Sequence, residues 1–106
     1  MALIEINKGS QFQIRPNFKE FEFFSKCSDS PSKHNLDEDL LNAVQYLRDK
    51  YNDKIKITST YRTPNCNLLA GGVKNSFHLK GRALDFQFVN DNKDYLKKIY
   101  NDFASR

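Results

Sequence analysis

The sequence predicts an α+β fold, a single small domain over residues 1–106 in which two main helices accompany a β-sheet. The length of 106 residues suits one modest hydrophobic core. Residues 55–61 and 83–89 alternate apolar and polar side chains, which is typical of half-buried strands. Residues 36–51 and the C-terminal stretch instead repeat apolar residues at the helical period.

The N-terminal third is expected to contribute core residues before the first helix. Residues 1–15 read as an irregular arm or short strands. Four aromatic residues follow, and we expect them to pack in the core, with an exposed binding surface as the alternative: Phe18, Phe21, Phe23 and Phe24. Residues 27–35 are rich in serine and contain Pro31, which predicts a loop.

The first helix is predicted to be capped by Asn35, with Glu38 three positions later as in a capping box. Acidic residues begin this segment and Arg48 and Lys50 end it, as the helix dipole favours. Its apolar stripe is Leu36, Leu40, Ala43, Val44, Leu47 and Tyr51. Asn52 and Asp53 are expected to end the helix.

The second half contains two predicted strands separated by a long loop. Pro64 ends the strand at 55–61, and the loop to Arg82 includes a possible helical turn at 67–70. A loop of this length in a small domain is usually functional. A last helix, capped by Asp91 or Asn92, is predicted from the stripe Leu96, Ile99, Tyr100 and Phe103.

Charge and composition narrow the functional classes. The net charge of +4 favours anionic partners, but it is the only feature that supports nucleic-acid binding, which we do not expect. The chain has no apolar run long enough to span a membrane and no visible signal peptide. We therefore expect synthesis in the cytoplasm, with export by another route left open. Cys27 and Cys66 are expected to be free thiols.

The segment 76–86 carries the strongest chemical signal. His78 and Asp85 are seven residues apart with Gly81 between them, and both are ligand types that suit Zn²⁺. Leu84, Phe86 and Phe88 share one face of the predicted strand, whereas Ala83, Asp85 and Gln87 share the other. Asp85 should therefore point away from the apolar face, toward the segment that contains His78.

These residues belong to a longer pattern that resembles peptidase family M15, the zinc D-Ala-D-Ala carboxypeptidases and phage endolysins. The family pattern S-x-H-x-x-G-x-A-x-D is matched at each fixed position, after a Tyr-Arg-Thr-Pro segment at 61–64: Ser76, His78, Gly81, Ala83 and Asp85. The resemblance covers roughly residues 18–90. It implies an antiparallel sheet and a hedgehog/DD-peptidase-like fold.

The resemblance also implies roles for individual residues. His78 and Asp85 would be two zinc ligands, and Arg62 would bind the terminal carboxylate of the substrate. Ser76 would contact the substrate or orient the site. The reaction would be hydrolysis of peptidoglycan stem peptides, on the cell wall after release. Pairing of Arg62 with Asp85, and a loop cap formed by Ser76, are the structural alternatives.

The chain departs from the family pattern at the third zinc ligand. Family members carry this ligand, a histidine, on a later strand with an acidic general base nearby, but the chain has only His34 and His78. His34, Cys66 or another carboxylate could complete the site, although we expect His34 to be a solvated loop residue. Otherwise the chain is a truncated or degenerate relative, a binding or structural module without catalytic activity.

Overall fold

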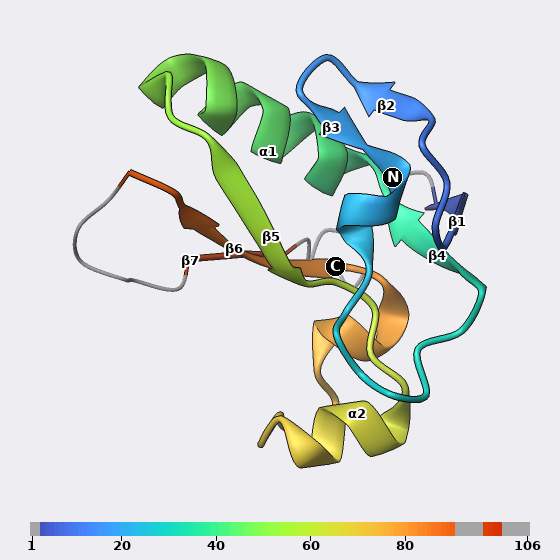
Figure 1. Ribbon diagram of the computed structural model, residues 1–106. Helices are drawn as coiled ribbons and strands as arrows, with labels where there is room; N and C mark the ends of the chain where they lie inside the picture. The colour runs from blue at the N-terminus through green and yellow to red at the C-terminus, as the bar shows by residue number, and fades with distance from the viewer. Residues whose placement is uncertain (1–2, 91–96, 101–106) are drawn as a thin grey trace.

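The computed structural model describes residues 3–90 and 97–100 and shows an α+β fold. Its strands form three small antiparallel sheets with the strand orders β1–β4, β2–β3 and β5–β6–β7 (Figure 1). The strands are β1 (Leu3–Asn7), β2 (Gln13–Arg15), β3 (Phe18–Lys19), β4 (Lys33–Asp37), β5 (Ile55–Ser59), β6 (Ala83–Phe88) and β7 (Lys97–Tyr100). The helices are η1 (Glu20–Phe23), α1 (Glu38–Tyr51), α2 (Pro64–Leu69) and η2 (Phe77–Lys80).

The core lies between α1, the three-stranded sheet and the N-terminal strands. It is built from apolar residues that are far apart in the sequence: Ile6, Phe18, Phe23, Phe24, Leu36, Leu40, Leu41, Val44, Ile55, Ile57, Leu84 and Phe86. The core role expected for the aromatic segment is confirmed for Phe18, Phe23 and Phe24, whereas Phe21 is 43% exposed. Burial of these side chains is the main favourable term that holds the elements together.

The first helix begins later than the sequence predicted. Residues 33–37 form β4, in which Asn35 pairs with Glu5 of β1, so the predicted cap at Asn35 is wrong. Asp37 caps α1 instead, and its carboxylate accepts a hydrogen bond from the backbone N–H of Asp39 at 3.0 Å. Strand pairing with β1 outweighed the local capping signal, and Leu36 contributes to the core from β4.

The predicted C-terminal helix is wrong for the part that the structure describes. Lys97–Tyr100 form β7, which pairs antiparallel with β6 in the register Leu84↔Ile99 and Asp85↔Lys98. As a strand, this segment forms its backbone hydrogen bonds with β6, whereas a short helix would leave many of its terminal N–H and C=O groups without partners. The predicted caps Asp91 and Asn92, with Leu96 and Phe103, lie outside the described residues.

The cysteines also differ from the expectation of free thiols. Cys27, in the loop before β4, and Cys66 in α2 form a disulfide with their Cα atoms 6.0 Å apart. The two residues are 39 positions apart in the sequence, and neither their number nor their spacing indicated that the fold would bring them together. The disulfide joins α2 to the segment that leaves η1.

Candidate functional site

The site lies where the end of β5, the η2 turn and the middle of β6 meet. The alternation expected for β6 is confirmed, because Leu84 and Phe86 enter the core and Asp85 faces the opposite way. Asp85 pairs with Ser59 of β5 at a bulge in the register. Such irregularities often redirect side chains next to functional sites.

The η2 turn places His78 above Asp85, and its two ends are fixed by Ser76 and Gly81. The Ser76 hydroxyl accepts a hydrogen bond from the backbone N–H of His78 at 3.2 Å. Gly81 ends the turn at φ +68°, in the left-handed region that favours glycine. A Cβ at this position would overlap the carbonyl oxygen of Asn35, so only glycine lets η2 approach β4 this closely.

His78 and Asp85 form the buried centre of the site, with 1% and 2% of their respective surfaces exposed. The Nδ1 atom of His78 lies 2.6 Å from the carbonyl oxygen of Thr60. Because a carbonyl can only accept, Nδ1 carries a proton that it donates to Thr60, and Nε2 faces Asp85. Nε2 and the Asp85 Oδ1 atom are 3.3 Å apart.

These two facing atoms are unusual for a buried site. Neither His78 Nε2 nor Asp85 Oδ1 has a hydrogen-bond partner in the described structure, although their separation is within ion-pair range. Lys98 on β7 lies 3.9 Å from the same oxygen, beyond hydrogen-bond distance. Buried polar atoms are normally satisfied, so this pair is a candidate ligand position.

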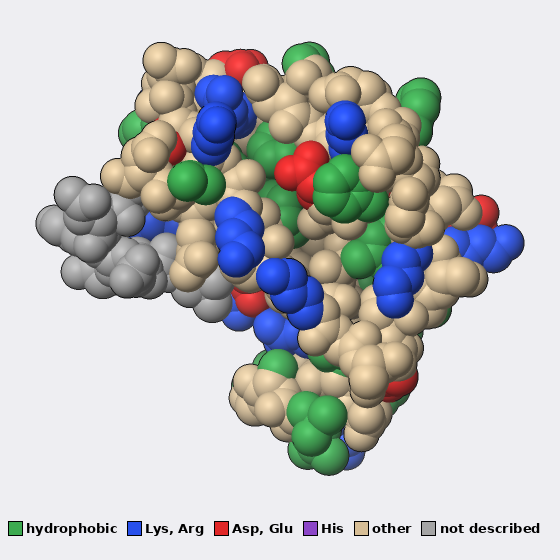
Figure 2. Space-filling model, in the orientation of Figure 1, with side chains coloured by type: hydrophobic (Ala, Val, Ile, Leu, Met, Phe, Trp, Pro, Cys, Tyr) green, Lys and Arg blue, Asp and Glu red, His purple; other side chains and the backbone are tan. Residues whose placement is uncertain are grey.

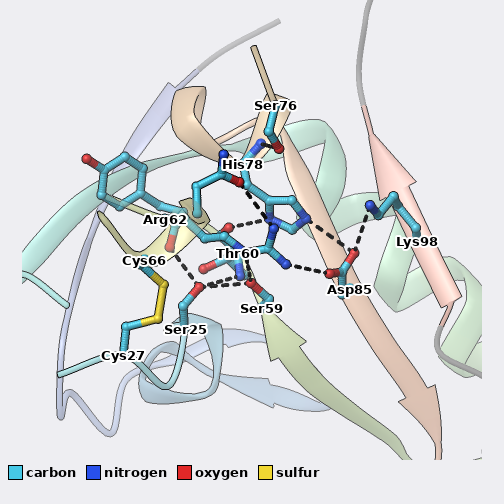
Figure 3. A network of polar contacts seen from close by, with 12 residues as sticks. Ser25, Cys27, Ser59, Thr60, Arg62, Cys66, Ser76, His78, Asp85 and Lys98 are labelled. Atoms are coloured by element: carbon cyan, nitrogen blue, oxygen red, sulfur yellow. Dashed lines mark hydrogen bonds and ion pairs between the residues drawn. A yellow bond between two sulfur atoms is a disulfide. The ribbon is translucent and has the colours of Figure 1, made fainter. Parts of the chain in front are cut away.

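Arg62 holds the second oxygen of the Asp85 carboxylate. Its Nη2 atom donates to Asp85 Oδ2 at 3.1 Å, and Nε donates to the Ser59 hydroxyl at 3.0 Å (Figure 3). Nη1 lies 3.4 Å from Asn67 Oδ1. The Arg62 side chain is 13% exposed. The sequence-based alternative that Arg62 pairs with Asp85 is therefore what the structure shows, and Arg62 still has an exposed edge.

A second layer of contacts holds Arg62 and Thr60 in place. The Ser25 hydroxyl donates to the carbonyl of Tyr61 at 2.7 Å, accepts from the N–H of Thr60 at 3.0 Å, and lies 3.1 Å from the Ser59 hydroxyl. Figure 3 shows the disulfide beside this network. Cys27 lies two residues after Ser25, and Cys66 directly precedes Asn67, whose side chain contacts Arg62. The disulfide therefore joins the segment of Ser25 to the segment of Asn67.

A hollow of about 210 Å³ opens beside this centre. Its lining includes Ser76, His78 and Lys98, together with the apolar side chains of Val73, Phe77 and Ala83. The hollow is lined by both polar and apolar side chains, so it suits a small amphipathic group next to His78.

The structure brings all four residues singled out from the sequence to this one place: Arg62, Ser76, His78 and Asp85. Sequence reasoning missed Ser59, Thr60 and Lys98, which contact them. The serine and threonine carried no signal beyond their place in a strand pattern. Lys98 carried no signal because the apolar spacing of its segment predicts a helix.

Among the described residues, neither His34 nor Cys66 lies with His78 and Asp85 as a third ligand. His34 is buried in β4 rather than solvated in a loop, and its ring nitrogens lie 3.2 Å from the carbonyl oxygens of Asn35 and Phe23. Burial lowers the pKa of His34. Cys66 is held in the disulfide. Across residues 3–90 and 97–100, no three His, Cys, Asp or Glu side chains form a metal-binding group.

The described part of the chain contains no helix that is both long and apolar enough to cross a membrane.

Comparison with known proteins supports one family. The family model described as Peptidase M15 matches residues 16–105, which is most of the chain. Comparison with curated proteins and with solved structures gave no significant match. The family match includes the whole segment that carries Arg62, Ser76, His78 and Asp85. The chain therefore belongs to peptidase family M15.

Proposed function

We propose that this chain is a zinc-dependent peptidase that hydrolyses peptide bonds in peptidoglycan stem peptides, as a carboxypeptidase or an endopeptidase. One observation carries the proposal: two buried polar atoms, His78 Nε2 and Asp85 Oδ1, face each other at 3.3 Å without a hydrogen-bond partner. Family membership supports peptidase chemistry in general.

The donor set fits a zinc ion. Two lone pairs at this separation repel each other unless a cation or a proton lies between them, and imidazole with carboxylate is a ligand combination that zinc accepts. The Thr60 carbonyl fixes the His78 tautomer through Nδ1, as metal-binding histidines usually require. Arg62 occupies Asp85 Oδ2 and leaves Oδ1 for the metal.

Zinc bound by these residues would lower the pKa of a coordinated water toward neutrality and polarise the scissile carbonyl. The chain's own residues would then bind and orient the peptide. Arg62 has five N–H donors, of which the contacts with Ser59, Asn67 and Asp85 use three. The remaining donors on its exposed edge suit a substrate carboxylate, for which a planar guanidinium is well matched.

Ser76 and Lys98 complete the proposed substrate contacts. Ser76 fixes the N-terminus of η2 as an acceptor, so its hydroxyl proton remains available to donate to a peptide in the neighbouring hollow. Lys98 adds positive charge on the β7 side of the same hollow. The disulfide supports action outside the cytoplasm, on the cell wall after release, because disulfides persist mainly in oxidising environments.

The experiment measures release of D-alanine from an acyl-Lys-D-Ala-D-Ala peptide, and cleavage of a stem-peptide amide bond, by the chain with and without zinc. We expect zinc-dependent cleavage that Asp85→Asn and His78→Gln abolish. Asp49→Asn, the same chemical change on the exposed face of α1, serves as the control and should keep full activity. Cleavage that survives Asp85→Asn would contradict the proposal.

A second candidate function follows from the ligand count. The described residues bring only two candidate metal ligands together, whereas catalytic zinc sites usually have three protein ligands. This favours a family member that binds stem peptides without cleaving them. That alternative predicts peptide binding without turnover and loss of binding in Arg62→Ala; any zinc-dependent turnover excludes it.

A further inference from the structure

The free edge of β5 is a second place where a ligand could bind. β5 is the edge strand of the sheet β5–β6–β7. The N–H of Val89 donates to the carbonyl of Lys54 at 2.8 Å, which sets the phase of the β5–β6 ladder. Because hydrogen-bonded pairs alternate along an antiparallel ladder, the backbone groups of Ile55 and Ile57 point away from β6. In the described part of the chain, no strand pairs with this edge.

Two hollows follow one another along this edge. One, of about 500 Å³, is lined by Lys56 and Ile57 of β5, and the other, of about 330 Å³, by Lys54 and Ile55. Glu22 of η1 lines both, so together they form a groove between β5 and the segment β3–η1, which we call the β5 groove. On the opposite wall Phe21 is 43% exposed, and the core residues Phe18 and Phe24 lie behind it.

The β5 groove has a basic rim. Five of its lining residues are basic: Lys8, Lys26, Arg48, Lys54 and Lys56. Glu22 is the one acidic lining residue, and its carboxylate already accepts a hydrogen bond from the backbone N–H of Lys19 at 2.7 Å. Figure 2 shows basic side chains on both sides of a hollow with a hydrophobic floor. Lysines on an edge strand oppose pairing with another copy of the same strand, but they attract an acidic one.

We propose that the β5 groove binds an extended acidic peptide segment as an added strand. The backbone of the segment would pair with the outward groups of Ile55 and Ile57. Side chains alternate along a strand, so acidic residues at every second position would lie on the face that carries Lys54 and Lys56. Apolar residues between them would contact the exposed ring of Phe21. This binding needs neither zinc nor the residues of the proposed hydrolytic site.

The test uses fluorescein-labelled Glu-Val-Glu-Val-Glu and fluorescence anisotropy on the full chain, with and without zinc. We expect saturable binding that is independent of zinc and weakens as salt rises. Lys56→Glu should weaken it about tenfold, since one attraction becomes a repulsion. Lys50→Glu, an equal charge reversal on the exposed surface of α1, is the control and should leave binding unchanged.

Two N-methylated peptides test strand pairing with the wild-type protein, so folding of a variant is not in question. Methyl groups on amides 2 and 4, or on amides 3 and 5, block opposite edges of the added strand. We expect one peptide to lose about tenfold in affinity and the other to bind nearly as well as the parent. Equal losses, unchanged binding in Lys56→Glu, or binding of a ten-residue oligothymidylate without binding of the peptide would each overturn the proposal. None of these outcomes depends on turnover, so the proposed hydrolysis is tested separately.

Discussion

Replacing Arg62 by methionine removes the cation that neutralises the buried Asp85 carboxylate. At 3.1 Å and an effective dielectric constant of about 20, the two charges attract each other by about 5 kcal/mol. Desolvation offsets part of this attraction, and Lys98 at 3.9 Å from the other oxygen compensates in part when Arg62 is lost. We therefore expect Arg62→Met to lower the free energy of unfolding by about 3 kcal/mol.

The assay is urea unfolding followed by circular dichroism at pH 7 on metal-free protein, as a double-mutant cycle with Asp85→Asn. Because the double variant lacks both charges, its loss should be about 2 kcal/mol smaller than the sum of the single losses. Arg48→Met, an equal change on the half-buried surface of α1, should cost no more than about 0.5 kcal/mol. If the loss in the double variant equals the sum of the two single losses within about 0.5 kcal/mol, Arg62 and Asp85 do not stabilise the fold as an ion pair.

Three further predictions concern the scaffold of the site. The double variant Cys27→Ser, Cys66→Ser should have a free energy of unfolding about 4 kcal/mol lower, because the disulfide links residues 39 positions apart in the sequence. Urea midpoints equal to those of the oxidised wild type would contradict this. Gly81→Ala should cost more than about 2 kcal/mol, because strain at φ +68° adds to the overlap with a β4 carbonyl. Gly9→Ala, with φ +79° but open space around it, is the control and should cost about 1 kcal/mol. Because burial lowers the pKa of His34 below 6.5, protonation favours the unfolded chain, so stability should fall as the pH drops through about 6.5. His34→Gln should flatten this decline in urea midpoints measured from pH 8 to pH 5; an unchanged slope would contradict the assignment.

The sequence predicted the elements in which local pattern and tertiary environment agree. The strands that contain Ile57 and Asp85 were expected from alternation, and both lie in the three-stranded sheet. The burial of Leu84 on one face and the opposite orientation of Asp85 follow from the two-residue period of a strand. The left-handed turn at Gly81 likewise agrees with a glycine between His78 and Asp85.

Features that depend on long-range pairing could not be predicted in this way. The stripe through Ile99 suited a helix, but pairing with β6 made the segment a strand and placed Lys98 beside Asp85. The residue types at 35–38 are typical of a helix N-terminus, but Asn35 pairs with a residue of β1 and is part of β4. The Thr60 carbonyl that fixes the His78 tautomer is a backbone group, and no residue pattern reveals a backbone contact of this kind.

We propose that His78 Nε2 and Asp85 Oδ1 hold a zinc ion. The most direct test is a crystal structure of the zinc-loaded protein with anomalous scattering recorded at the zinc absorption edge. We expect one strong peak about 2.0–2.2 Å from both atoms, with the Thr60 carbonyl still at Nδ1 of the His78 ring. A zinc peak elsewhere on the chain, or no peak between His78 and Asp85 at saturating zinc, would contradict it.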